Sequence, residues 1–81
     1  MDTTGVKEML TYVVGSLVEH PEDIRVEVQE SGSAITLQLS VAAEDMGRVI
    51  GRNGRIAKEI RTLIKAMGLR EDKHISVVIS D

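Results

Sequence analysis

The chain has 81 residues, enough for one domain, and its 42% hydrophobic and 28% charged residues are typical of a globular protein. It contains no cysteine, which excludes a disulfide framework and a thiolate metal site. We find neither a secretory signal nor an apolar stretch that could span a bilayer, so a cytoplasmic protein is expected, and the net charge of −3 alone argues against a nucleic-acid partner.

The first half of the chain predicts one helix followed by two strands. Apolar residues recur at helical spacing from Val6 to Val18, with Thr4 as the expected N-cap and Pro21 as the signal that ends the helix. Apolar and polar residues alternate at 24–29 and again at 35–41, which predicts two strands with one buried face each. A stretch of turn composition at 30–33 joins them, so we expect an antiparallel hairpin.

The second half predicts two helices and a third strand. Residues 43–50 can form a short helix, with Glu44 and Asp45 in its first turn, where the helix dipole favours acids. A long apolar stripe begins after Arg55, and Gly68 is a natural helix stop. Alternation at 75–80 predicts the last strand. The order α-β-β-α-α-β predicts an α+β fold of two layers, a three-stranded sheet covered by three helices.

Charge is divided unevenly along the chain. Segment 48–70 carries seven basic residues against the single acid Glu59, a net charge of +6, whereas the remaining residues carry three bases and twelve acids, a net charge of −9. The seven basic residues are Arg48, Arg52, Arg55, Lys58, Arg61, Lys65 and Arg70. Such a split gives a one-sided field that attracts a polyanion, although a solvated basic helix face would produce the same pattern.

The motif Gly51-Arg52-Asn53-Gly54 lies between the two helices of the second half. Alone it is weak, because seven glycines in 81 residues produce roughly half a match per chain by chance. Its context, a short helix before it and a basic amphipathic helix after it, is more specific. Glycine tolerates positive φ and leaves room for a sugar-phosphate backbone, and the following helix offers N–H groups and its positive dipole end to phosphate oxygens.

The stretch Val49–Ile56, followed by Ile60, resembles the signature of KH domains, and the order of elements resembles their type II, prokaryotic arrangement. The longer stretch Val41–Arg55 is similar to the small stand-alone bacterial KH proteins of the KhpA type, with Ala43 where many relatives have proline. The resemblance covers essentially the whole chain. It implies a single KH domain over residues 1–81, with its GxxG loop at 51–54.

The resemblance also implies a function. It implies binding of single-stranded RNA through the loop, RNA-chaperone activity, and a homodimer or a heterodimer with a larger KH-containing protein of the KhpB type. Relatives are linked to cell length and cell-wall homeostasis. Ile50 and Ile56 match the floor of the RNA groove, although helix-spaced aliphatic residues are as often core. The expected RNA-binding residues are Gly51, Arg52, Asn53, Gly54, Arg55, Arg48, Lys58, Ile50 and Ile56.

The sequence contains no catalytic constellation, so we expect a binding module rather than an enzyme, with no cofactor, no metal, no small-molecule substrate and no membrane partner. His20 and His74 lack metal-ligand spacing. With Tyr12 as the sole aromatic residue, base stacking is absent from the expected groove, which predicts micromolar or weaker binding with strong salt dependence.

Two other functions stay open at this point. One is a protein-interaction adaptor that uses the KH fold mainly to pair with a partner. The other is a helix-turn-helix protein that reads duplex DNA with the helix after Arg55. The apolar stripe of that helix argues against the second, because it commits the helix to a core; its members are Ile56, Ile60, Leu63 and Ile64.

Overall fold

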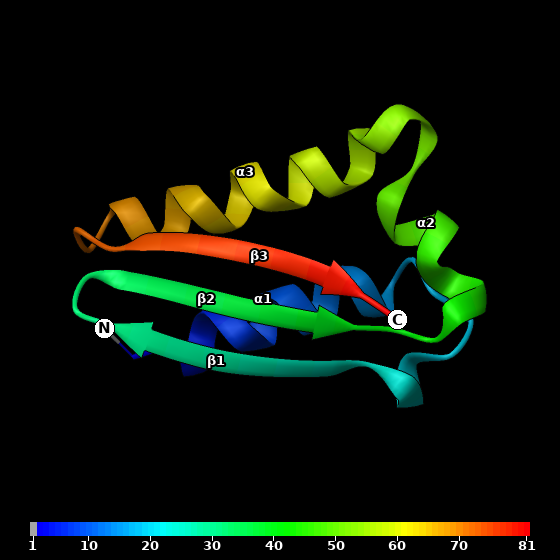
Figure 1. The fold of residues 1–81 in the computed structure, drawn as a ribbon, viewed down its shortest axis with the longest axis horizontal. Coiled ribbons are helices and arrows are strands. Elements are labelled where there is room, and N and C mark those ends of the chain that lie inside the picture. Colours follow the sequence, from blue (N-terminus) through cyan, green and yellow to red (C-terminus); the bar gives the residue numbers. More distant parts are fainter. Residues whose placement is uncertain (1) are drawn as a thin grey trace.

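The computed structural model describes residues 2–81, and its centre is a three-stranded sheet (Figure 1). Strands β1 (Arg25–Ser31) and β2 (Ala34–Ser40) run antiparallel. Their turn is tighter than the expected one at 30–33, because pairing extends to the ends of both strands and Gly32 adopts a φ of +60°. Strand β3 (His74–Ser80) runs parallel to β2 on its other side. The sheet order β1-β2-β3 leaves β1 and β3 as edge strands.

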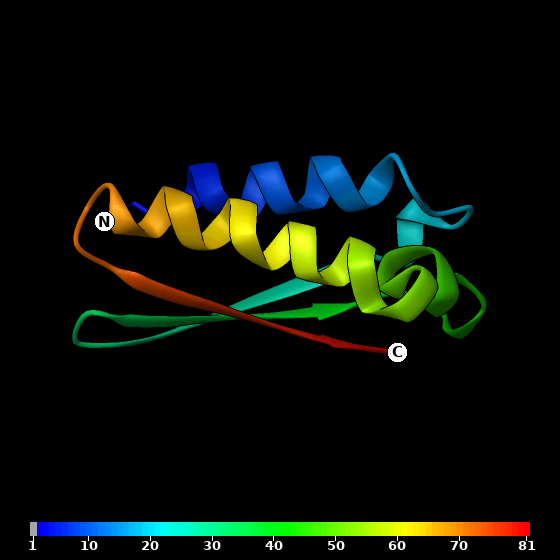
Figure 2. The same cartoon turned by 90° about the horizontal axis from the view of Figure 1, so that it is seen from above.

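The helices lie over one face of this sheet and at its end (Figure 2). Helix α1 (Thr4–Gly15) and helix α3 (Arg55–Leu69) run side by side across the face. The short helix α2 (Met46–Ile50), preceded by a 3₁₀ turn at Ala43–Asp45, leads into the loop before α3. The predicted order and the two-layer α+β arrangement are confirmed. Within residues 2–81, no helix has both the length and the apolar character needed to cross a membrane.

The core lies between the helices and the covered face of the sheet. Every second strand residue points toward the helices because side chains alternate along a strand. The buried aliphatic residues of the strands are Val26, Ile35, Leu37, Leu39, Ile75 and Val77, and those of α1 and α3 are Val6, Leu10, Val14, Ala57, Ile60 and Ile64. Each large one contributes about 1.5–3 kcal/mol. Helix α3 therefore turns its apolar stripe to the sheet, as expected, except for Leu63, which is 43% exposed.

Helix α1 is shorter than its apolar pattern predicts. It ends at Gly15 rather than just before Pro21, because glycine has low helix propensity and the chain leaves the helical path there. The N–H of Leu17 instead bonds to the carbonyl of Val14 at 2.9 Å in a tighter turn. Leu17 and Val18 still pack against the core from this turn, so their apolar spacing reflects burial rather than helix.

Two predicted helix-end signals act differently from expectation. Thr4 is the first helical residue and not the N-cap, and its N–H donates a hydrogen bond to Oδ1 of Asp2 at 2.9 Å. Gly68 does not stop α3, which continues to Leu69. Gly68 is buried, and a Cβ atom there would lie 2.6 Å from Cγ1 of Ile75. The glycine is thus explained by close packing of α3 on β3.

Replacing Gly68 by alanine should therefore destabilise the fold. The added Cβ would also lie 2.9 Å from the backbone oxygen of Lys73, which cannot move without shifting the chain. We expect the free energy of unfolding to fall by about 1–3 kcal/mol in chemical denaturation. Gly47→Ala is the matched control, because no atom lies within 4 Å of its Cβ position. Equal stability of the two variants would contradict the packing explanation.

Candidate nucleic-acid interface

The loop between α2 and α3 is a tight reversal that contains three residues with positive φ. Helix α2 ends at Ile50, Gly51 has a φ of 76°, and Arg52–Gly54 form a single 3₁₀ turn. Within that turn Asn53 has a φ of 56° and Gly54 a φ of 73°. Glycine adopts this region without steric cost, and asparagine does so more readily than most residues. The N–H of Gly54 donates to the carbonyl of Gly51 at 3.2 Å and closes the turn.

The two glycines of the loop are required for different reasons. A Cβ atom on Gly51 would lie 2.6 Å from Cγ1 of Ile56, so the loop is folded down onto the first turn of α3. At Gly54 no atom lies within 4 Å of the Cβ position. The space beside Gly51 is therefore filled by Ile56, whereas Gly54 leaves an open side where a phosphate group has room to approach.

Three of the predicted cations lie within four residues of Gly54 in the chain. Arg52 belongs to the loop, and Arg55 and Lys58 belong to the first turns of α3; all three side chains are exposed. In the part of the chain that the structure describes, none of them forms an ion pair. No side chain caps the N-terminus of α3, where the helix dipole is positive. The end of the helix and the three cations together suit an anionic ligand.

The remaining predicted site residues are placed differently. Ile50 and Ile56 are both half-buried, and Ile56 packs against the core. Neither is fully buried nor fully exposed, which explains why spacing alone could not separate core from groove. Arg48 does not join the loop cations: its Nη2 lies 2.8 Å from Oε1 of Glu19, and its Nη1 lies 3.5 Å from Oδ1 of Asp45.

A groove of about 600 Å³ runs between α3 and the open edge of β3. Its α3 wall consists of Arg61, Thr62 and Lys65, and its other wall is residues 74–77 of β3. Because β3 is an edge strand, one row of its backbone N–H and C=O groups has no strand partner. The groove therefore combines cations with backbone hydrogen-bonding groups, whereas the side chains of Ile75 and Val77 are buried in the core.

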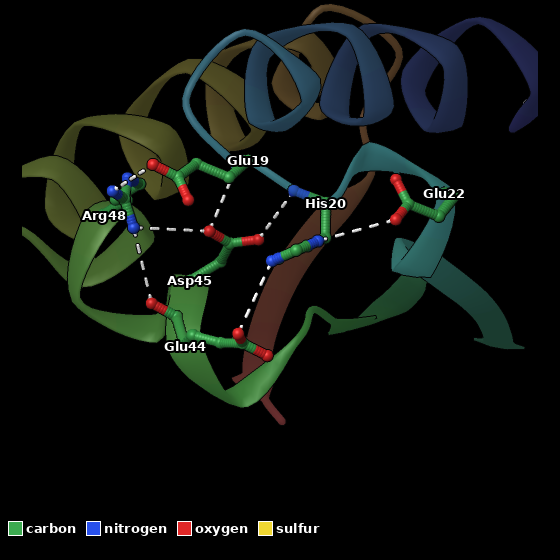
Figure 3. A network of polar contacts seen from close by, with 6 residues as sticks. All are labelled: Glu19, His20, Glu22, Glu44, Asp45 and Arg48. Atoms are coloured by element: carbon green, nitrogen blue, oxygen red, sulfur yellow. Dashed lines mark hydrogen bonds and ion pairs between the residues drawn. The ribbon is translucent and has the colours of Figure 1, made fainter.

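Asp45 lies in the first helical turn as predicted, and it also has a structural role that this position does not indicate. Its side chain is fully buried. Its Oδ1 accepts a hydrogen bond from the N–H of Glu19 and its Oδ2 one from the N–H of His20, both at 3.0 Å (Figure 3). The carboxylate thereby fastens the start of α2 to the chain that follows α1. Asp45 sits three residues before Arg48, a spacing typical of a helical ion pair, but no sequence signal indicated its burial or its distant backbone partners.

The network around Asp45 shifts two pKa values. Burial alone would raise the pKa of Asp45, but the two backbone N–H donors and the nearby charges of His20 and Arg48 hold it below its ordinary value of 3.8. Burial alone would lower the pKa of His20, but the carboxylates of Glu44, Asp45 and Glu22 raise it above its ordinary value of 6.5. The contribution of His20 to stability is therefore complete below pH 6.5 and is lost as the pH rises through the raised pKa.

His20 also belongs to the one group of potential metal ligands within residues 2–81, which the sequence analysis did not anticipate. Ligand atoms of His20, Glu22 and Asp23 lie within 4.8 Å of one another. The two ring nitrogens of His20, however, each lie 3.5 Å from a carboxylate oxygen, Nδ1 from Glu22 and Nε2 from Glu44 (Figure 3). Ion pairing thus accounts for the proximity of His20 and Glu22, and both acids of the turn are exposed.

A mixed three-stranded sheet in the order β1-β2-β3, helices in the order α-β-β-α-α-β and a Gly-X-X-Gly loop between α2 and α3 define a KH domain of type II. The chain belongs to the KhpA/KhpB family of KH domains, whose family model matches residues 7–79.

Curated relatives agree with this assignment. The chain is 49% identical over 74 residues to the RNA-binding protein KhpA of Listeria monocytogenes serovar 1/2a, covering 91% of this chain and 97% of that protein. It is 46% identical over 74 residues to the RNA-binding protein KhpA of Clostridium perfringens, covering 91% and 99%. It is 42% identical to the RNA-binding protein KhpA of Bacillus subtilis over 81 residues, the full length of both chains.

Replacing Asp45 by asparagine should lower stability at neutral pH, because an amide keeps the shape but has only one oxygen for two N–H donors. Since the pKa of Asp45 is lowered, its contribution is complete above pH 3.8 and is lost as the pH falls through the folded-state pKa. At pH 7 we expect a lower denaturation midpoint for Asp45→Asn than for wild type. In acid the two midpoints should become equal. Asp72→Asn is the control, being exposed at a φ of 58° that asparagine tolerates. A difference in denaturation midpoint that stays constant across this pH range would contradict the role of the ionised Asp45 carboxylate.

Proposed function

We propose that the chain is a binding module for single-stranded RNA, in which the loop 51–54 and the N-terminus of α3 hold the sugar-phosphate backbone. The observation that carries the proposal is the open side of Gly54, beside the exposed cations of Arg52, Arg55 and Lys58. The shared name of the relatives, RNA-binding protein, supports RNA as the anion. KH domains clamp about four nucleotides in this way. If the partner is RNA, the chain would act in the cytoplasm.

The other predicted site residues take supporting parts in this proposal. Ile50 and Ile56, both half-buried, would supply aliphatic surface beside the loop. Arg48 would add positive charge, but its guanidinium is shared with Glu19 and Asp45. We therefore expect substitution of Arg48 to reduce stability together with RNA affinity, whereas substitution of Arg52, or of Asn53 by aspartate, should affect RNA binding alone.

The proposed binding is weak and exchangeable, which suits an RNA chaperone. Tyr12, the sole aromatic residue, is exposed on α1 beside Val28 of β1, on the side of the sheet away from β3. Base stacking on aromatic rings, which contributes about 1–3 kcal/mol per base elsewhere, is therefore absent from the groove. Contacts to phosphates would dominate, and such contacts weaken as salt rises. A module of this kind binds and releases single strands without committing them to one structure.

The test of the loop is the double variant Arg52→Asp with Asn53→Asp, which sets two negative charges against the phosphates. We expect its affinity for a uridine octamer to fall by about tenfold or more and the salt slope of log K to lose roughly 0.7 for each phosphate contact removed. Fluorescence anisotropy over a series of salt concentrations measures both quantities.

The matched control is Lys7→Asp with Thr11→Asp, which makes the same change in net charge at two exposed positions of α1. It should bind RNA almost as wild type does, because only general electrostatics are altered. Unchanged RNA binding by a folded loop variant would sink the proposal.

A second candidate function is pairing with another KH chain, and one observation favours it. An apolar hollow of about 260 Å³ lies between α1 and α3, lined by Val13, Leu17, Ile56, Ile60 and Leu63 with Glu59 at its side. Leu63 is 43% exposed there. A second copy of the chain, or a partner of the KhpB type, could bury this surface. Pairing would raise the apparent RNA affinity through effective concentration.

Leu63→Glu tests this candidate. We expect wild type to sediment as a dimer and Leu63→Glu as a monomer, because a charge cannot be buried cheaply in an apolar contact. Leu69→Glu is the control, since Leu69 is 49% exposed on the same helix but does not line the hollow. A monomeric wild type would contradict self-association. If the loop double variant kept both its partner and its cellular phenotype, the adaptor role would be the main one.

A further inference from the structure

The guanidinium of Arg61 is tied to the open edge of β3. Arg61 lies on α3, and its Nε donates a hydrogen bond across the groove to the backbone oxygen of Val77 at 3.1 Å. Its side chain is exposed and lines the groove. Over residues 2–81 it forms no ion pair, so the charge of the guanidinium is not neutralised.

The carbonyl of Val77 is available because it faces away from β2. The N–H of His74 and the C=O of Ser80 bond to segments that flank β2, at 2.9 and 3.1 Å. Backbone groups alternate in direction along a strand, so the residues at odd positions of β3 direct theirs to the open edge; these are Ile75, Val77 and Ile79. Arg61 therefore bonds to one of the backbone groups at the open edge of β3, which have no partner strand.

The bond to Val77 leaves a defined part of the guanidinium free. Arginine has five N–H donors in one plane, of which Nε–H is used here and the four on Nη1 and Nη2 remain. Because Nε is anchored, the plane of the fork is fixed before any ligand arrives. Two parallel donors in a fixed plane match a ligand with two adjacent acceptors, which they bind in bidentate fashion.

We propose that Arg61 selects the base in the groove, favouring a base that carries two adjacent hydrogen-bond acceptors. Guanine offers O6 and N7, and cytosine offers O2 and N3. Adenine sets a donor beside each acceptor on its exposed edges, and uracil separates its two carbonyl groups by an N–H, so neither matches the fork. This inference rests on the proposed binding of single-stranded RNA and adds a base preference to it.

The position of Arg61 relative to the loop fits this role. Arg61 lies six residues after Arg55 on the same helix, a rise of about 9 Å along the axis. Helix α3 begins at the loop and runs back along β3 in the opposite direction (Figure 1). A strand held by its phosphates at Gly54 would thus bring a neighbouring base into the groove between Arg61 and β3, where Thr62 and Ser76 also lie.

The experiment compares four RNA octamers, one of uridine alone and three with guanosine, cytidine or adenosine at one central position. We expect wild type to bind the guanosine or the cytidine octamer about tenfold more tightly than the uridine and adenosine octamers. Arg61→Lys keeps the charge but loses the fork. It should bind all four octamers with equal affinity, whatever that affinity is relative to wild type. Arg70→Lys is the matched control, an exposed arginine of the same segment outside the groove, and should keep the preference.

The outcomes separate this inference from the proposed function. Equal binding of all four octamers by wild type, a preference for adenosine or uridine, or a preference kept in Arg61→Lys would overturn the base selection while RNA binding stands. No binding of any octamer by folded wild type would overturn both. Should Arg61→Lys fold poorly, the Nε–H resonance of Arg61 in wild type gives a second readout. Its chemical shift should change on addition of the preferred octamer and should not change with the uridine octamer. A shift change with the uridine octamer alone would overturn the inference.

Discussion

The parallel pairing of β2 with β3 is the constraint on which the rest of the structure depends. Parallel neighbours cannot be joined by a hairpin turn, so the chain must leave one end of the sheet and return to the other. Here the connection spans residues 41–73 and contains α2, the Gly-X-X-Gly loop and α3. Because β3 is an edge strand, α3 packs on the sheet beside an open edge. The loop and the groove are therefore two parts of one crossover.

Two contacts hold the first part of this crossover in place. The buried carboxylate of Asp45 accepts N–H groups from Glu19 and His20, which fixes where α2 begins. The contact between Gly51 and Ile56, too close for any side chain at Gly51, fixes where the loop returns to α3. A buried carboxylate is stable only while its hydrogen bonds are made, so α2 cannot drift from the chain after α1 without a large cost. The loop is thus presented by a rigid support, although its own tip is exposed.

Local patterns in the sequence were sufficient for the fold and for the loop. Alternation located all three strands, and the two glycines marked the reversal, because each of these features is set by neighbouring residues. The N-cap and the end of α1 were predicted wrongly for local reasons, whereas the roles of three other residues depend on distant partners. Asp45 meets N–H groups 25 and 26 residues away, and Gly68 is fixed by contact with β3. From the sequence alone, Arg61 is indistinguishable from a solvated cation. Its acceptor is a backbone oxygen sixteen residues later, and every residue has such an oxygen whatever its type.

Not every basic residue behind the charge of +6 in segment 48–70 is available to a ligand. Arg48 is neutralised by Glu19 and Asp45 and adds little to the field around the loop. Arg61 bonds to a neutral carbonyl and keeps its full charge, as do the three exposed cations near Gly54. The acids of β1 lie at the opposite edge of the sheet from β3. A protein with a net charge of −3 can therefore present a positive surface along its crossover, because ion pairing and sheet order decide which charges a ligand meets.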